Sequence, residues 1–248
     1  MERAEVPAVS FEYIKNIWVS GDGYAYPGGA ADYESQLRTI LDTIKGTETG
    51  KTVMGFFALR SHRVWIVPPD EAICRAEPGA FAQPVDFVAA VRRGADLRDG
   101  GDGRLDPDHR HGSGAGSDSR ILFDPIGWGN CAPTFTAPEV VIVHELFHAM
   151  RHVFGALRNT PMRDFKTVEE LYSIFVQNMY ATEKGLPLRA DKLPYSHKLD
   201  HSMAGNPAFH APMRDLFDMM PSIGNALARV NISYNPFQDW RDFSRKSH

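Results

Sequence analysis

Two histidines separated by three residues, His144 and His148, lie in an apolar segment typical of a buried helix. Residues four apart stack on one face of a helix, so both imidazole rings can reach one metal ion. Glu145 is rotated about 100° from His144, which places its carboxylate beside that ion, where it can take a proton from water. Nitrogen ligands in this arrangement favour Zn²⁺. The HExxH pattern therefore predicts an α-helix that forms one wall of a catalytic zinc site. The alternative interpretation is a partly buried helix that happens to carry two histidines.

The helix that carries the motif is predicted over residues 137–154. Thr136 and Glu139 form a capping box with a proline in the first turn, and Gly155 marks the expected end. The apolar run Val140–Val143 directly precedes the motif and can bury the helix in a core.

A third protein ligand is needed, because catalytic zinc keeps its fourth position for water. The metzincin pattern HExxHxxGxxH is excluded, since Arg151 and Phe154 occupy its glycine and third histidine positions. A carboxylate from the next helix, predicted over residues 167–184, is the other common solution. Glu170 is preferred over Glu169, although Glu170 also completes a capping box and could cap the helix instead. The remaining candidates are His152, His197, His201 and His210.

Other polar residues are candidates for supporting roles. Tyr195, His197 or His201 could donate a hydrogen bond to the oxyanion that forms when water attacks an amide. His152 lies one turn beyond the motif, too far along the helix to bind the same ion easily. We therefore expect His152 at the surface or behind the metal ligands.

Outside these two helices the chain mixes strand and helix patterns. Strands are predicted at 11–19, 63–67, 85–88 and 120–124, with a hairpin turn at 21–23, and helices at 32–46, 51–59, 213–219 and 223–230 before a polar tail. These patterns predict an α+β fold, a small twisted sheet over the HExxH helix with an edge strand near 121–123. We expect one domain over 1–248, with a sheet-bearing part to about residue 130 and a helical part from about 131.

A glycine-rich segment over residues 94–119 interrupts these patterns and contains His109 and His111. It is predicted to be a long flexible loop, either a solvated surface loop or a lid over a cleft. A second glycine-containing segment, 46–52, resembles a phosphate-binding loop. It has three residues between its glycines where that loop needs four, and it follows a helix pattern, so we interpret it as a helix end followed by a helix start.

Composition narrows the function. The formal net charge of the 248-residue chain is -4, so no nucleic-acid partner is expected, and no apolar run is long enough to span a membrane. The N-terminal residues lack a Sec-type signal, and the two cysteines, Cys74 and Cys131, are expected to be reduced.

Several segments together resemble the NleD-type effector metallopeptidases, zinc proteases delivered by bacterial secretion systems. The similar segments are the helix and TGKT run at 41–52, the Gly-Ser segment at 112–118, the HELFH motif, and the Glu-Glu helix with its GLPLR exit at 185–189. The resemblance implies a gluzincin, with His144 and His148 as zinc ligands, Glu145 as base and a downstream glutamate as third ligand. The run from Glu170 is also similar to that around the third ligand of anthrax lethal factor.

With this resemblance, the expected fold is an α+β, zincin-like metalloprotease domain. The expected function is a zinc-dependent endopeptidase that acts on a protein or peptide. It would be a secreted effector or toxin with a secretion-system or immunity partner, or a cytoplasmic enzyme of the producing cell. Two alternatives remain: a zinc-dependent amidase acting on a non-protein or cell-wall substrate, and a non-catalytic zinc-stabilised binding module.

Overall fold

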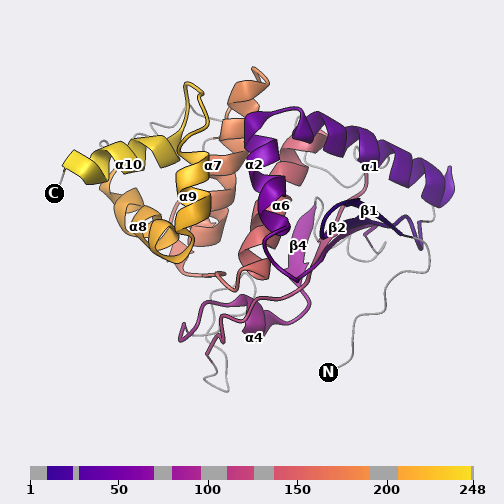
Figure 1. Ribbon diagram of the computed structural model, residues 1–248, viewed down its shortest axis with the longest axis horizontal. Helices are drawn as coiled ribbons and strands as arrows, with labels where there is room; N and C mark the ends of the chain where they lie inside the picture. The colour runs from indigo at the N-terminus through magenta and orange to yellow at the C-terminus, as the bar shows by residue number, and fades with distance from the viewer. Residues whose placement is uncertain are drawn as a thin grey trace.

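The computed structural model describes residues 10–24, 28–69, 80–95, 111–125, 137–189 and 206–246. Over these ranges the protein is mixed α/β, with a small sheet packed against helices (Figure 1). This agrees with the coarse prediction of a small sheet beside a helical part. Cys74 and Cys131 lie outside the described residues.

The sheet is formed by β1 (Phe11–Ile14), β2 (Ile17–Val19), β3 (Val64–Val67), β5 (Ser119–Leu122) and β4 (Phe81–Pro84), in that order. The three central strands are parallel, and β1 and β4 pair antiparallel at the two ends. The alternating apolar residues of the inner strands are fully buried on the face toward the helices, as expected for a half-buried sheet.

The predicted strand at 11–19 is wrong in one respect, because the chain turns back within it. Asn16 has a φ of 69°, a left-handed conformation that asparagine tolerates, and the hairpin turns here instead of at 21–23. The side-chain amide of Asn16 donates to the carbonyls of Phe57 (3.0 Å) and Arg60 (2.7 Å). These contacts tie the hairpin to the end of a helix distant in sequence, which no local pattern reveals.

The predicted strand at 85–88 is also wrong. The strand β4 ends at Pro84, and Asp86 is the N-cap of a short helix, α4 (Phe87–Ala90), accepting from the Ala89 N–H. The predicted edge strand near 121–123 is internal, since β5 lies between β3 and β4. The outer strand of the described sheet on this side is β4.

Two helices connect the parallel strands β2 and β3. The first, α1 (Gly29–Lys45), begins at the N-cap Gly28, so Asp32, the predicted N-cap, lies in its first turn. The second, α2 (Glu48–Phe57), begins three residues before its predicted start, with Thr47 as N-cap. The N–H groups of Glu48 and Thr49 donate to the carboxylate of Glu183. The segment that resembles a phosphate loop is therefore a helix start that binds a carboxylate of the same chain.

The helices α6 (Pro138–Val153) and α7 (Val168–Glu183) confirm the two long helices predicted from the sequence. Ala137 is the N-cap of α6, so the predicted capping box does not form there, and Thr136 lies outside the described residues. The two helices are joined through β6 (Pro161–Met162) and β7 (Lys166–Thr167). In the described part, α6 lies against β4, β5, α1, α2 and α7, which places it at the centre of the molecule.

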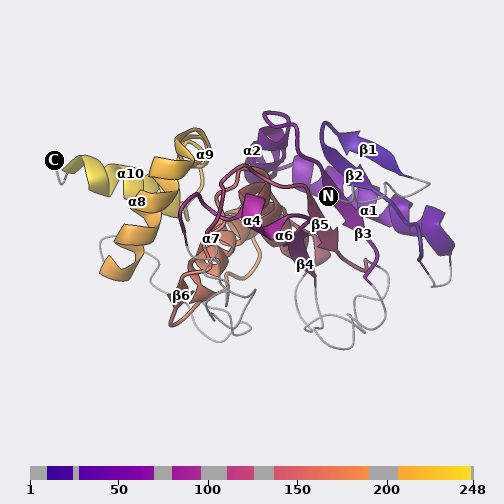
Figure 2. The same ribbon diagram turned by 90° about the horizontal axis from the view of Figure 1, so that it is seen from below.

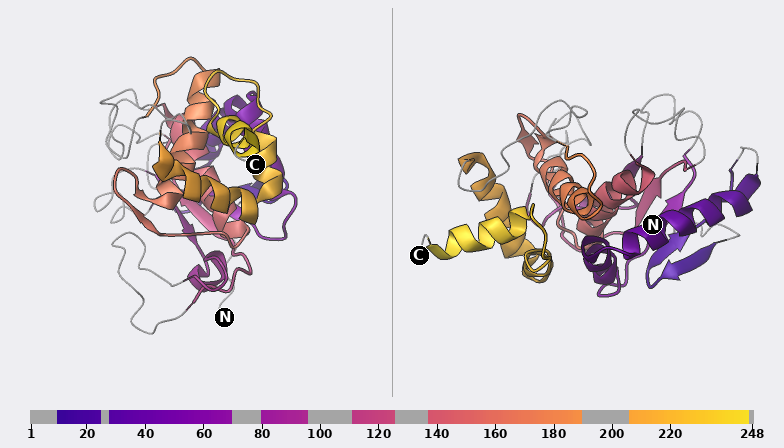
Figure 3. Two further views of the ribbon diagram at one scale, coloured as in Figure 1. Left: turned by 90° about the vertical axis from the view of Figure 1, so that its left-hand side faces the viewer. Right: turned by 90° about the horizontal axis from the view of Figure 1, so that it is seen from above.

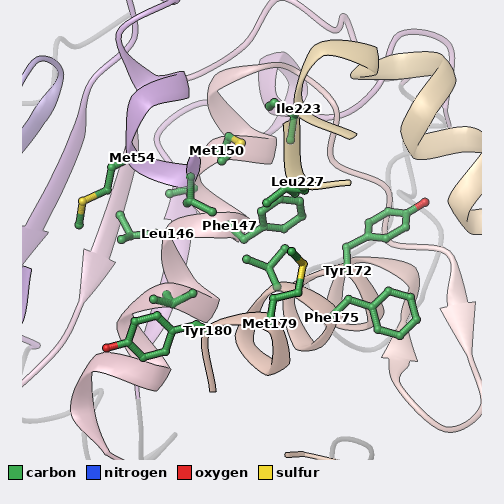
Figure 4. Close-up of a cluster of buried hydrophobic side chains, with 14 of the residues drawn as sticks. Met54, Leu146, Phe147, Met150, Tyr172, Phe175, Met179, Tyr180, Ile223 and Leu227 are labelled. Atoms are coloured by element: carbon green, nitrogen blue, oxygen red, sulfur yellow. The ribbon is translucent and has the colours of Figure 1, made fainter. Parts of the chain in front are cut away.

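The C-terminal helices lie at the end of the molecule away from the sheet (Figure 3). They are α8 (His210–Met219), preceded by a 3-10 turn at Pro207–Phe209, then α9 (Pro221–Leu227) and α10 (Pro236–Lys246). The predicted polar tail is wrong, because Phe237 and Trp240 of α10 are buried. Apolar side chains of α2, α6, α7 and α9 meet in one cluster (Figure 4). This cluster joins α9 to the helices that carry the motif.

The glycine-rich segment is partly ordered. Residues 112–117 donate backbone hydrogen bonds to α4, to the residues after it and to the end of α6. A Cβ on Gly112 would lie 2.4 Å from the Arg92 carbonyl oxygen, and one on Gly116 would lie 2.3 Å from that of Val153. Glycine is required where these chains approach so closely. The flexible-loop prediction is therefore wrong for this part, and residues 96–110, including His109, lie outside the described residues.

Candidate metal centre

The side chains of His144 and His148 project from the middle of α6 toward one point. Their Nε2 atoms are 3.1 Å apart, and their rings meet edge to face. Four-residue spacing on a regular helix produces this arrangement, as the sequence predicted.

The carboxylate of Glu170, in the first turn of α7, completes the cluster. Its Oε2 lies 3.5 Å from His144 Nε2, and its Oε1 lies 4.0 Å from His148 Nε2. Ligands held about 2.0–2.1 Å from a tetrahedral zinc ion are about 3.3 Å from one another. The separations in this cluster bracket that value, and one ligand atom from each of the three residues lies within 4.8 Å of the others. The cluster is therefore compatible with a metal ion.

Capping does not compete for the Glu170 carboxylate in this structure. Thr167 caps α7 by accepting from the Glu170 backbone N–H at 3.3 Å. The N–H of Thr167, which a capping-box glutamate would bind, donates instead to the Phe165 carbonyl at 2.7 Å. The backbone of Glu170 thus serves the helix start while its carboxylate faces the histidines.

Gln177 supports the cluster, and the sequence analysis missed it. Its Oε1 lies 3.0 Å from Nδ1 of His144 in the protein interior. An amide oxygen only accepts, so Nδ1 donates the proton and the lone pair of Nε2 points toward the cluster. Gln177 follows Glu170 by seven residues, two helical turns, and lies on the same face of α7. That spacing is the signal that could have identified it.

Glu145 is held between α6 and the outer strand. Its Oε2 accepts from the Ala82 N–H of β4 at 2.7 Å, and the residue is 6% exposed. The Val85 N–H donates to the carbonyl of Asp118, so the backbone groups of Val85 point toward β5. Backbone groups alternate in direction along an antiparallel strand, so those of Ala82 and Pro84 point away from β5. The Glu145 carboxylate therefore lies at the outer edge of β4 and comes from the residue that follows His144 in α6.

Glu169, the alternative third ligand, points elsewhere. It accepts from Nη2 of Arg151 at 2.7 Å, from Nε of Arg151 at 3.0 Å, and from the Arg158 backbone N–H at 2.6 Å. Burial lowers the pKa of Arg151, but the adjacent Glu169 outweighs burial and raises it above its ordinary value. This buried contact holds α6 against α7.

Two of the other predicted candidates, His152 and His210, are not brought to the cluster. His152 is buried and its Nδ1 lies 2.9 Å from Ser119 Oγ, which corrects the expectation of a surface or ligand-supporting position. Burial, with the nearby charge of Arg151, lowers its pKa to about 3. His210 packs against the rings of Trp240 and Phe243. The residues at 195, 197 and 201 lie outside the described part of the chain.

The likeness of this chain to known proteins is distant. No protein-family model matches the chain, and no curated protein matches it. Among solved structures, the chain is similar to the catalytic domain of Clostridium botulinum neurotoxin serotype F, at 14% sequence identity and a TM-score of 0.42. The alignment covers 95% of this chain and 67% of that chain. A likeness of this size assigns neither a family nor an activity.

None of the helices in the described ranges is long and apolar enough to cross a membrane.

Proposed function

We propose that the protein is a zinc-dependent endopeptidase with a zincin-like site in which His144, His148 and Glu170 hold the metal. The observation that carries the proposal is the convergence of these three side chains at ligand spacing. Glu145 follows His144 in α6, and its carboxylate accepts from the outer edge of β4. A zinc ion held there would polarise the scissile carbonyl and lower the pKa of the attacking water.

The remaining chemistry belongs to side chains of the protein. Glu145 takes the proton from the attacking water and passes it to the leaving amine. The Ala82 N–H holds the Glu145 carboxylate in place, and Gln177 holds the His144 ring. These two contacts support a role in turnover, because they fix the base and a ligand before substrate arrives.

The outer strand supports a peptide as the substrate. Ala82 and Pro84 direct their carbonyl oxygens away from β5, so an extended peptide can donate N–H groups to them. The strand near 121–123 that was predicted to be the edge is internal, so the proposed substrate edge is β4. The resemblance to NleD-type effectors supports a protein target and a secretion-system or immunity partner.

Two measurements test the proposal. Elemental analysis of the purified chain should find about one zinc ion per chain. Glu145→Gln should keep that zinc and lose peptide cleavage by about 10²- to 10⁴-fold. Cleavage by Glu145→Gln at the wild-type rate would refute the mechanism. A protein that binds zinc, unfolds without it and cleaves no peptide would be a zinc-stabilised binding module.

A further inference from the structure

The helices α6 and α7 lie side by side (Figure 2), and two contacts show that they run in opposite directions. Nδ1 of His144 on α6 lies 3.0 Å from Oε1 of Gln177 on α7. About two turns later on α6, Arg151 donates to Glu169, which lies about two turns earlier on α7. Each turn forward along α6 is therefore matched by a turn back along α7.

This register places Ser173 opposite His148. His148 lies one turn after His144 on the same face of α6, and Ser173 lies one turn before Gln177 on the same face of α7. Since His144 faces Gln177, the next facing pair along the two helices is His148 and Ser173. Glu170, three residues before Ser173, approaches the same histidine, with its Oε1 4.0 Å from His148 Nε2.

The hydroxyl of Ser173 is buried without an evident structural purpose. The residue is 0% exposed, and in the described part of the chain its Oγ has no hydrogen-bond partner. A serine inside a helix can donate to the carbonyl four residues earlier, but Ser173 does not do so. An unpaired buried hydroxyl destabilises a folded protein, so its position opposite a metal-ligand candidate calls for an explanation.

The chemistry of a histidine ligand supplies that explanation. A histidine that binds a metal through Nε2 carries its proton on Nδ1, and that N–H is donated to an acceptor behind the ring. Gln177 provides such an acceptor for His144. A serine oxygen can accept in the same way. Ser173 stands opposite His148 as Gln177 stands opposite His144.

We propose that Ser173 is a positioning residue of the metal centre, whose Oγ accepts from Nδ1 of His148 when the metal is bound and so fixes that ring. The inference rests on the proposed zinc function of the cluster. In this arrangement one face of α7 supplies the ligand Glu170 and orients both histidines of α6.

The test compares zinc affinity with the stability of the metal-free, full-length chain. Ser173→Ala removes the hydroxyl and leaves the rest of the side chain in place. It should weaken zinc binding about tenfold in competition with a chromophoric chelator. The same change should raise the Tm of the metal-free chain by about 2–4 °C, because a buried unpaired hydroxyl is lost. A serine with a structural role alone would not move the two quantities in opposite directions.

Thr49→Val is the matched control. Thr49 in α2 is also 0% exposed, and within the described ranges its Oγ1 also has no hydrogen-bond partner. Its backbone N–H donates to Glu183, at the opposite end of α7 from Glu170. Valine keeps the shape of threonine, so this variant should melt no lower than wild type. Its zinc affinity should be unchanged.

Nuclear magnetic resonance of the zinc-loaded chain reports on the hydrogen bond itself. The Nδ1–H signal of His148 should be protected from exchange in wild type and should shift or disappear in Ser173→Ala. The corresponding signal of His144, which has Gln177 as its acceptor, should remain.

The outcomes separate this inference from the proposed function. Unchanged zinc affinity in Ser173→Ala, an unchanged His148 signal, or a metal-free Tm that falls would overturn the role of Ser173 and leave the zinc site intact. A wild-type chain that binds no zinc would overturn the proposed function and this inference with it.

Discussion

Glu169 and Glu170 are adjacent at the start of α7, yet their carboxylates face different partners. Glu169 binds the buried guanidinium of Arg151, while Glu170 faces the histidine pair of α6. Successive residues on a helix differ by about 100°, so one turn can serve both contacts. The ion pair fixes how α7 lies against α6, and the rotation of α7 directs Glu170 to the cluster.

Replacing each glutamate by glutamine separates the proposed ligand role of Glu170 from the structural role of Glu169. Glu170→Gln should weaken zinc binding by at least about 100-fold, because it removes an anionic donor from the cluster. Glu169→Gln should keep zinc affinity within about tenfold of wild type. Competition with a chromophoric chelator measures both. Equal loss in the two variants would contradict the assignment of Glu170.

Loss of the Gln177 acceptor should weaken zinc binding without removing a ligand. Gln177→Leu is expected to lower zinc affinity by about 10- to 100-fold, because Nδ1 of His144 loses the acceptor that orients the ring. Gln177→Glu keeps an acceptor oxygen and serves as the control. The same chelator competition applies, and unchanged affinity in Gln177→Leu would show that Gln177 has no such role.

Removing one partner of the Arg151–Glu169 pair should destabilise the protein more than replacing both partners with apolar residues. Arg151→Met leaves the Glu169 carboxylate buried without its partner and should lower the free energy of unfolding by about 3–5 kcal/mol. Adding Glu169→Leu to that variant should recover most of the loss. Urea unfolding of the metal-free chains measures both. A double variant less stable than Arg151→Met would contradict this account.

His152 should make stability fall in acid. Its pKa is about 3 in the folded protein and about 6.5 when unfolded, so below pH 6.5 the unfolded chain takes up a proton that the folded chain does not. Folding stability should therefore decrease from about pH 6.5 toward pH 3, by a few kcal/mol. His152→Gln cannot take up that proton. The stability difference between wild type and His152→Gln should shift with pH over this window, and a constant difference would exclude His152 as the cause.

The parts of the fold that follow from local patterns were predictable from the sequence. Both α6 and α7 contain apolar runs; Gly155 follows the end of α6, and Thr167 is the N-cap of α7. Once α6 forms, the four-residue spacing places His144 and His148 on one face. The last helix was missed although Asn235 accepts from the Gln238 N–H as an N-cap, because the polar composition hid its short apolar stripe.

Features that depend on distant partners were not predictable in this way. Apart from Phe81, the residues of β4 have weak strand preference, and their strand exists through pairing with β5. Both glutamates at the start of α7 fit a ligand role by position alone. Only the contact of Glu169 with the buried Arg151, eighteen residues earlier in the chain, separates them.

The outer strand β4 also limits how this protein can pair with copies of itself. Of its two outward-facing residues, Pro84 has no N–H and Ala82 donates its own to Glu145. A strand from another copy could donate to the two carbonyl oxygens there, but Ala82 and Pro84 offer it no unoccupied N–H. It could therefore form only about half of the hydrogen bonds of a normal strand pair. Such an edge resists the open-ended strand addition that leads to aggregates, while still allowing a short peptide to bind and leave.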